Sequence, residues 1–348
     1  MRVGILGYGR FGRALAGLAR EAGARCLALD PVVPVPRDEE AGSLEGLVED
    51  SEFIVLALPI PALPGALRRV APLLRPSQVL FDVGSVKVMP CRWMAEILGP
   101  SRPYAGTHPL FGPVSLARAE RPLRVVLCPA AEHPQAAGRV GAFFERLGCE
   151  VLVQSAEDHD RVMATTHALT FFLAKGLLEV GAGAELPFTP PSFHAIQHTL
   201  ESVREDAGHL FVTVQNQNPF AAGARAGLLE ALQAIERDLR EAAERPDEES
   251  PGLAIPELSA RSPRLQEVRE VIDGLDRDIL DLLARRMELA RRAALAKAEL
   301  GAPVLDPSRE ASLLEKRRAW AAEAGLDPAG SEEVFRSILR LSRKTQGR

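Results

Sequence analysis

The start of the chain constrains the fold most. The stretch "MRVGILGYGRFG" opens with an apolar run that leads at once into Gly7, Gly9 and Gly12, spaced G-x-G-x-x-G. Where a strand, turn and helix bind a dinucleotide, such glycines allow the tight turn, the approach of backbone N–H groups to pyrophosphate, and close packing of helix on strand. The pattern therefore predicts a dinucleotide-binding βαβ unit, although the same glycines could serve the turn alone. The expected cofactor-binding residues are Gly7, Tyr8, Gly9, Arg10, Phe11, Gly12 and Asp30.

The expected cofactor depends on Asp30. This residue ends the second apolar run, about twenty residues after Gly7, where a carboxylate can accept hydrogen bonds from ribose hydroxyls. The same carboxylate would repel the 2′-phosphate of NADP, while Arg10, Arg13 and Arg25 lie near it in the sequence and favour an anion. On balance the sequence predicts NAD.

Short apolar runs alternate with helix-length segments up to about residue 155. The expected strands are residues 2–6, 25–30, 52–59, 78–84, 124–128 and 150–154, and the clearest helices between them are residues 11–22, 62–74 and 134–147. This alternation is typical of a mostly parallel, doubly wound sheet. We therefore expect a Rossmann-type α/β domain over residues 1–155.

The pattern changes after residue 155. Helical spacing replaces strands over residues 156–245, which predicts an all-α domain. Residues 246–262 combine proline, serine and acidic residues without periodicity, as a linker does, and residues 263–348 again indicate helices. A chain of 348 residues is long enough for this division into several compact units.

Composition narrows the classes of partner. The net charge of −5 argues against general binding of nucleic acid, which needs a basic face. The apolar run at residues 53–67 is interrupted by prolines and is too short to span a bilayer, and the chain opens without the features of a signal peptide. The four cysteines lack zinc-site spacing, and His194 and His198, at i and i+4, have no third ligand at a recognisable distance, so no metal is expected. We expect a cytoplasmic protein whose partners are small molecules.

Three polar motifs lie between residues 82 and 164. Residues 82–87 read DVGSVK, residues 108–113 read HPLFGP and residues 159–164 read HDRVMA. In this order, over about residues 1–245, they resemble the prephenate and arogenate dehydrogenase family. The resemblance implies that His108 binds the C4 hydroxyl of the substrate and draws off its proton, while hydride passes from C4 to the nicotinamide and CO2 leaves. It also implies that Ser85 orients the imidazole or the substrate.

Two positions depart from that family. Phe171 stands where members commonly have a second histidine, and His194 stands where they have the arginine that binds a substrate carboxylate. His167, about one helical turn before Phe171, is a nearby substitute for the histidine, and Arg161 and Arg204 are the nearest cations. The dehydrogenase substrate could therefore be prephenate, arogenate or an amino analogue of prephenate.

A charged residue interrupts the apolar face of the C-terminal helix. That face consists of Leu265, Val268, Ile272, Leu275, Ile279, Leu282, Leu289, Ala293 and Ala296. An apolar residue at position 286 would continue this face, but the residue there is Arg286. Lys297 lies within about 20° of Arg286 around the helix axis. Because a cation on an apolar face needs an opposite charge, the pair predicts a pocket for an anionic ligand. Arg269 lies too far along the helix to serve this pocket and would serve another, such as one in a partner subunit.

These positions resemble the all-helical class of chorismate mutase over about residues 264–346. By this resemblance the pocket combines Arg269 from the partner with Arg286, Lys297, Asp306, Arg309, Glu310, Ser342 and Gln346. The arginines would hold both carboxylates of chorismate in a chair-like fold, and Lys297 and Gln346 would hydrogen-bond the ether oxygen, where negative charge develops as the C–O bond breaks. Glu310 would bind the ring hydroxyl. Asp306 could instead only cap the helix that begins at Pro307.

The two resemblances together imply a bifunctional enzyme of tyrosine biosynthesis. Its mutase part would convert chorismate to prephenate, and its dehydrogenase part would oxidise prephenate to 4-hydroxyphenylpyruvate with NAD. Both families pair their helical parts about a two-fold axis, so a homodimer is expected. Two alternatives stay open: a dehydrogenase half specific for arogenate or an amino analogue, or a catalytically silent half that regulates the mutase.

Overall fold

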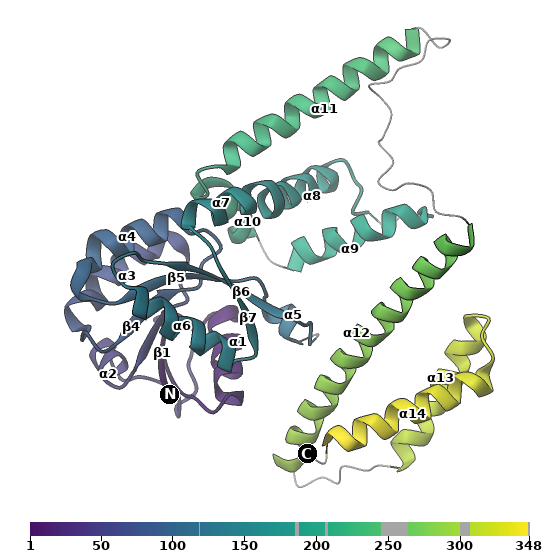
Figure 1. The fold of residues 1–348 in the computed structure, drawn as a ribbon, viewed down its shortest axis with the longest axis horizontal. Helices are drawn as coiled ribbons and strands as arrows, with labels where there is room; N and C mark the ends of the chain where they lie inside the picture. The colour runs from purple at the N-terminus through teal and green to yellow at the C-terminus, as the bar shows by residue number, and fades with distance from the viewer. Residues whose placement is uncertain (118, 185–187, 206–207, 245–263, 300–306, 347–348) are drawn as a thin grey trace. The chain divides into compact units, whose positions relative to one another are not determined.

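The protein forms two compact units. The computed structural model describes residues 1–117, 119–184, 188–205, 208–244, 264–299 and 307–346. One unit comprises Met1–Pro113 and Pro122–Pro256, and the other comprises Val114–Arg121 and Glu257–Arg348. The expected linker, residues 246–262, lies outside the described residues. The expectation of a Rossmann-type domain followed by all-helical regions is confirmed (Figure 1).

A seven-stranded sheet forms the centre of the first unit, in the order β2-β1-β3-β4-β5-β6-β7. Its strands are β1 (Arg2–Leu6), β2 (Arg25–Leu29), β3 (Phe53–Leu56), β4 (Val79–Asp82), β5 (Tyr104–Pro109), β6 (Leu123–Pro129) and β7 (Cys149–Val153). All neighbouring strands are parallel except β5 and β6, which are antiparallel. The carboxyl ends of β1 to β5 therefore share one edge, where ligands of open α/β sheets bind.

The sequence analysis missed β5, the strand that carries His108. Its sequence, YAGTHP, has two residues that favour a strand, Tyr104 and Thr107, but it also contains glycine and proline, which are depleted in strands. Pairing with neighbouring strands makes this segment a strand, because β5 is hydrogen-bonded on one side to β4 and on the other to β6. All its residues are buried. Gly106 is needed there, since a Cβ at this position would lie 2.5 Å from the sulfur of Cys91. His108 thus belongs to the strand instead of following it.

Helices cover both faces of the sheet (Figure 1). One face packs against α2 (Leu44–Glu49), α3 (Leu63–Val70) and α4 (Val88–Leu98), whose leucines meet those of the strands. The other face packs against α1 (Arg10–Glu21) and α6 (Pro134–Arg146). There Phe143 and Phe144 contact the ring of Phe81, with centroids 5.4 and 5.6 Å apart. Both faces are therefore buried, as expected for a mostly parallel sheet.

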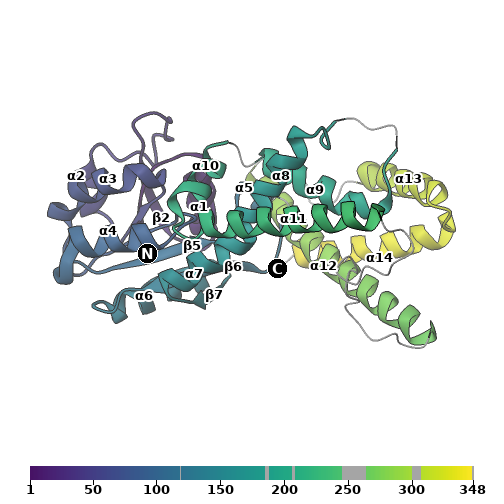
Figure 2. The ribbon, with the colours of Figure 1, turned by 90° about the horizontal axis from the view of Figure 1, so that it is seen from above.

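The helical part of this unit begins directly after the sheet. Ser155 caps α7 (Ala156–Met163) by accepting a hydrogen bond from the Asp158 backbone. The chain continues through a π-helical segment (Ala164–Ala168) into α8 (Leu169–Glu179), and then forms α9 (Pro191–Glu205), α10 (Gly208–Gln217) and α11 (Ala221–Glu244). Figures 1 and 2 show α11 leading away from the sheet. Its apolar residues Leu229, Leu232, Ile235 and Leu239 are exposed.

The second unit consists of helices. They are α5 (Pro113–Ala117), the long α12 (Arg264–Glu299), α13 (Pro307–Glu323) and α14 (Pro328–Gln346). α14 packs beside both α12 and α13. The apolar face of α12 that the sequence predicts is not covered, because Ile272, Leu275 and Leu282 are 49%, 56% and 58% exposed. Within the described part of the chain, no helix combines the length and apolarity needed to cross a membrane.

Candidate active sites

The glycine turn between β1 and α1 has a shape that fits a dinucleotide. Gly7 has φ +102°, and a Cβ there would lie 2.3 Å from the Ala57 carbonyl oxygen, while a Cβ on Gly12 would lie 2.1 Å from the Gly7 carbonyl oxygen. The fold itself therefore requires these two glycines. A Cβ on Gly9 would meet nothing within 4 Å. No side chain caps α1 and its first turn has no acidic residue, so open space and uncapped N–H groups suit pyrophosphate.

Asp30 lies beside this turn, at the end of β2. Its Oδ2 accepts a hydrogen bond from the Tyr8 backbone N–H at 2.7 Å, and its Oδ1 accepts from Val32 and Val33 at 2.8 and 2.9 Å. Burial raises the pKa of Asp30, but the hydrogen bonds from Val33, Tyr8 and Val32 outweigh it and hold that pKa below its ordinary value. The carboxylate stays ionised at the position where it would meet ribose hydroxyls.

The other residues of the glycine motif point in different directions. The Tyr8 side chain is buried and its hydroxyl donates to Glu39 Oε2 at 2.6 Å, so it stabilises the turn from the protein interior. Arg10 is exposed at the start of α1. Phe11 faces Phe111 of the HPLFGP motif, with ring centroids 6.1 Å apart. The structure thus joins the glycine turn to the loop that follows His108.

The strand under His108 is fixed by a buried cation. Lys87, fully buried, donates to the Asp82 carboxylate and to the Thr107 carbonyl oxygen, the latter at 2.6 Å. The Thr107 hydroxyl in turn donates to the Asp82 carbonyl oxygen at 2.5 Å. The ends of β4 and β5 are therefore held together immediately before His108.

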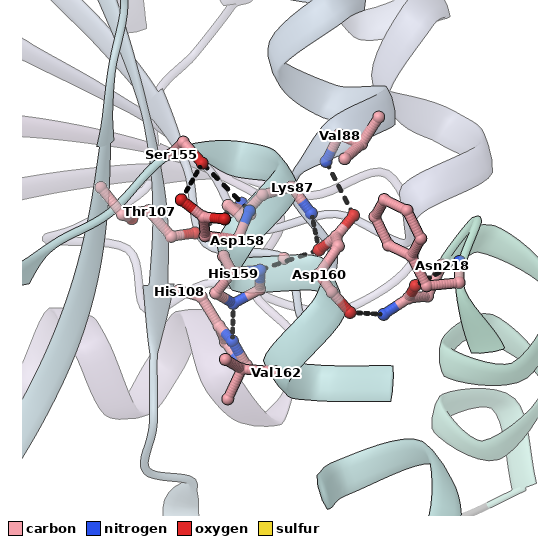
Figure 3. Close-up of polar contacts among 12 residues, drawn as sticks. Lys87, Val88, Thr107, His108, Ser155, Asp158, His159, Asp160, Val162 and Asn218 are labelled. Atoms are coloured by element: carbon pink, nitrogen blue, oxygen red, sulfur yellow. Dashed lines mark hydrogen bonds and ion pairs between the residues drawn. The ribbon is translucent and has the colours of Figure 1, made fainter. Parts of the chain in front are cut away.

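His108 begins a buried chain of hydrogen bonds that reaches α7 (Figure 3). Its Nδ1 lies 2.8 Å from Nε2 of His159, and Nδ1 of His159 lies 2.8 Å from Oδ1 of Asp160. The Asp160 carboxylate also accepts from the backbone N–H groups of Lys87 and Val88 at 2.7 and 2.8 Å. The middle of α7 is therefore tied to the first turn of α4.

The position of α7 is fixed from the other side by Asn218. Its side chain donates to the Asp160 carbonyl oxygen at 2.7 Å (Figure 3). His167, in the π-helical segment, stacks on His108 with ring centroids 6.5 Å apart and contacts Phe171 edge-on at 4.7 Å. His167 is thus near His108, as its place in the sequence suggests, whereas Phe171 supplies a buried apolar wall.

The environment keeps His108 neutral. Burial lowers the pKa of His108 well below its ordinary value, and the charges of His159, Lys87 and His167 lower it further. An uncharged imidazole has a lone pair with which to accept a proton. His108 therefore has the protonation state of a general base.

Other expected dehydrogenase residues lie elsewhere. Ser85 is partly exposed in the loop after β4, and the His108 ring is hydrogen-bonded to His159 instead. The role expected of Ser85 toward the imidazole or the substrate stays a prediction. His194 is exposed on α9. The Arg161 guanidinium lies 4.2 Å from the centroid of the Phe220 ring. The side chains of Arg204 and His198 lie outside the described residues.

In the second unit, Arg286 of α12 meets Ser342 of α14. Its Nη1 donates to the Ser342 hydroxyl oxygen at 2.5 Å, and that hydroxyl donates to the Ile338 carbonyl oxygen at 2.9 Å. Burial, and then the charge of Arg317, lowers the pKa of Arg286 below its ordinary value. Two cations in one partly buried place favour an anionic ligand.

The remaining mutase positions are only partly described. Glu310 accepts two hydrogen bonds from Arg343, at 2.8 and 2.9 Å, Lys297 is half-buried and Arg309 is exposed. Asp306 and the side chains of Arg269 and Gln346 lie outside the described residues. Across the parts of the chain that the structure describes, no group of three His, Cys, Asp or Glu side chains is placed to hold a metal ion.

Comparison with known proteins assigns the first unit. Residues 35–153 match the family described as prephenate dehydrogenase, nucleotide-binding domain, and residues 1–63 match the NAD-binding domain of D-isomer specific 2-hydroxyacid dehydrogenases. The 4-amino-4-deoxyprephenate dehydrogenase of Streptomyces pristinaespiralis is 30% identical over 233 residues, which cover 64% of this chain and 75% of that enzyme. The chain belongs to the prephenate dehydrogenase family.

A second match extends this family assignment. Residues 268–347 match chorismate mutase type II. The chorismate mutase of Methanocaldococcus jannaschii is 32% identical over 83 residues, which cover 24% of this chain and 84% of that protein. This member of the prephenate dehydrogenase family therefore also carries a chorismate mutase domain.

Other relatives match over shorter lengths. The cyclohexadienyl dehydrogenase of Zymomonas mobilis is 29% identical over 154 residues. This match covers 42% of this chain and 53% of that enzyme, so the chain spans about half of the enzyme's length. A crystal structure of prephenate dehydrogenase from A. aeolicus, in complex with hydroxyphenyl propionate and NAD+, has a TM-score of 0.58 at 18% identity over 79% of this chain and 98% of that one. The fold of the first unit is thus that of the prephenate dehydrogenase family.

The sequence analysis gave no role to His159, Asp160 and Asn218. A signal for Asp160 is present, because Asp160, Ala164 and Ala168 lie four residues apart and share the buried side of one helical stretch. A carboxylate on a buried face needs partners, which is the argument that identified Arg286. Asn218 gives no such signal, since its partner is a backbone carbonyl 58 residues away.

Proposed function

We propose that the chain is a bifunctional enzyme that converts chorismate to prephenate and oxidises prephenate to 4-hydroxyphenylpyruvate and CO2 with NAD. The observation that carries the dehydrogenase part is the neutral, buried His108 at the same sheet edge as the glycine turn and Asp30. The mutase part is supported by Arg286, which faces Ser342 and shares its pocket with a second positive charge.

In the dehydrogenase reaction, His108 accepts the proton of the C4 hydroxyl as the carbon loses hydride. The glycine turn and Asp30 would hold NAD, which would supply the hydride acceptor. Loss of CO2 makes the ring aromatic, and the proton returns from His108 to the phenolic oxygen, so none is consumed. The buried Lys87–Asp82 pair keeps β5 in place during these steps. Burial of the site excludes water that would compete for the lone pair of His108.

In the mutase reaction, no nucleophile is needed. Arg286 would bind one carboxylate of chorismate, and a cation from a second subunit, Arg269, would bind the other. Lys297 would hydrogen-bond the ether oxygen as its C–O bond breaks. Ser342 fixes the guanidinium of Arg286 in advance, so that less ordering is required when the ligand binds.

A homodimer is part of the proposal. The apolar face of α12, including Ile272, Leu275 and Ile279, is about half exposed, and α11 presents a second exposed apolar row. Faces of this kind mark interaction sites, and a second copy would cover both and bring in Arg269. The four cysteines form no disulfide, which suits the reducing cytoplasm.

One specific observation favours a second candidate substrate. The relative matched over 75% of its length acts, by its name, on 4-amino-4-deoxyprephenate, and His194 is exposed where an arginine is expected. The dehydrogenase half would then oxidise the amino analogue, with His108 in the same role toward the nitrogen.

A single assay with purified protein separates these functions. NADH is followed after NAD is added with prephenate, arogenate or 4-amino-4-deoxyprephenate in turn, and loss of chorismate is followed in parallel. The proposal expects NADH from prephenate at the highest kcat/KM. A higher kcat/KM for the amino analogue supports the second candidate. Turnover of chorismate with no NADH from any of the three substrates contradicts both and leaves a regulatory first unit.

A further inference from the structure

His108 and the two residues behind it, His159 and Asp160, form a buried line of hydrogen-bonded groups. The rings of His108 and His159 meet edge to face with centroids 5.1 Å apart, and the second ring nitrogen of His159 faces the carboxylate of Asp160. His108, His159 and Asp160 are 6%, 2% and 0% exposed. Because all three come from the end of β5 and the middle of α7, this line connects the sheet to the helical part of the same unit.

The hydrogen bonds assign the proton on each ring nitrogen. An ionised carboxylate only accepts hydrogen bonds, and both oxygens of Asp160 already accept from backbone N–H groups. Nδ1 of His159 must therefore be the donor to Asp160, which leaves a lone pair on its Nε2. Nδ1 of His108 must then donate to that nitrogen, and the lone pair of His108 is on Nε2.

We propose that His159 and Asp160 form a proton relay that fixes the tautomer of His108 and takes up the positive charge that His108 receives from the substrate. As the substrate O–H proton binds Nε2 of His108, the proton on Nδ1 of His108 moves to Nε2 of His159. His108 is then neutral again, and the imidazolium is His159, in contact with the Asp160 carboxylate. Return of both protons restores the starting state, so atoms and charge balance without another reactant.

Electrostatics around the two rings favour this direction of charge movement. His108 faces Lys87, from the loop before α4, and His167, from the π-helical segment, and both lower its pKa together with burial. His159 instead contacts a carboxylate directly. A positive charge is thus more stable one ring further from the substrate. His159 is a positioning residue, since it does not touch the reacting atoms. Its second role in the proposal is to take up the positive charge from His108.

The tautomer can be tested without any substrate. The relay rests on the proposed dehydrogenase activity, but the tautomer does not, so the two can fail separately. Protein labelled with 15N-histidine is examined by NMR in the absence of ligands, and the His108 and His159 signals are assigned by their loss in His108→Asn and His159→Gln. We expect protonated Nδ1 and unprotonated Nε2 in both rings. On acidification, the His108 ring should stay uncharged below its ordinary pKa of about 6.5. The opposite tautomer of His108, or an imidazolium at His108 already at about pH 6.5, overturns the proposal.

Kinetics test the uptake of charge. His159→Gln keeps an acceptor near Nδ1 of His108 but cannot take a proton, whereas His159→Leu removes both functions. We expect kcat with the dehydrogenase substrate to fall about 100-fold in His159→Gln, with KM within about twofold, and further in His159→Leu, whose His108 tautomer becomes mixed. His133→Gln, a change at a buried histidine bound to the Gly99 carbonyl, is the matched control and should keep its activity. Unchanged kcat in folded His159→Gln contradicts the relay.

Discussion

The rings of Phe11 and Phe111 lie 6.1 Å apart, and they join the glycine turn to the loop that follows His108. Phe11 lies in the first turn of α1, beside the glycine turn proposed to bind pyrophosphate, and Phe111 comes three residues after the proposed base. The contact would therefore set the distance between the proposed cofactor site and the base through two side chains that take no part in the chemistry.

Removing one of these rings should loosen that spacing. We expect Phe111→Ala to raise the KM for NAD several-fold and to lower kcat, because an aromatic contact of this kind contributes about 0.5–1.5 kcal/mol beyond its buried area. Steady-state NADH formation measures both constants, and loss of chorismate should not change. Phe188→Ala, at a ring that is 85% exposed, serves as the control. Equal effects of the two substitutions would contradict the role given to Phe111.

The glycines of the turn should respond differently to alanine. A Cβ on Gly12 would lie 2.1 Å from a backbone oxygen, so Gly12→Ala should lower the melting temperature of the protein. A Cβ on Gly9 meets no protein atom, so Gly9→Ala should leave the melting temperature within about 1 °C yet weaken binding of NAD at least tenfold by titration calorimetry, since the methyl group would occupy pyrophosphate space. Unchanged NAD affinity in Gly9→Ala would show that the cofactor does not lie over this turn.

Features with a local sequence signal could be predicted, whereas features that depend on tertiary pairing could not. The glycine turn, Asp30 and the long α12 have signals within short windows, and each lies as expected. β5 has no such signal, because its strand structure depends on pairing with β4 and β6. The partner of His108 could not be deduced either, since His159 is 51 residues away and reaches it only after α7 packs beside α4.

The pH dependence of stability should report on His108. Its pKa is lowered in the folded protein and near 6.5 when unfolded, so the unfolded state binds the extra proton as pH falls below about 6.5 and stability decreases there. We expect the melting temperature to drop between pH 7.5 and pH 5, and to drop less in His108→Gln. The same shift keeps His108 unprotonated, so the acid limb of kcat/KM should lie below pH 6.5. Parallel stability curves for both proteins would show that His108 is not held neutral.

The uncovered face of α12 should control assembly. Ile279 is 53% exposed in one chain, and Ile279→Glu would place a charge in the interface proposed for the second copy. We expect a monomer by light scattering and at least a 100-fold loss of mutase activity, because Arg269 of the partner subunit no longer reaches the pocket. Ala284→Glu, on an exposed part of the same helix outside the apolar face, should remain dimeric. A dimer with full mutase activity in Ile279→Glu would contradict the shared pocket.

Substitution of Arg286 should separate the mutase activity from the dehydrogenase activity. This guanidinium is partly buried, is bound to Ser342 and lies near the charge of Arg317, and among the residues that the structure describes it has no anionic partner. Arg286→Ala should reduce loss of chorismate at least 100-fold, because it removes a charge that binds a carboxylate in the transition state. NADH formation from added prephenate should stay within about twofold, as His108 and the glycine turn belong to the other unit. Arg291→Ala, at an exposed arginine of the same helix paired with Glu288, should preserve both activities. Loss of both activities in Arg286→Ala would mean that the two reactions share residues across the units, whereas retention of mutase activity would move the chorismate pocket away from α12.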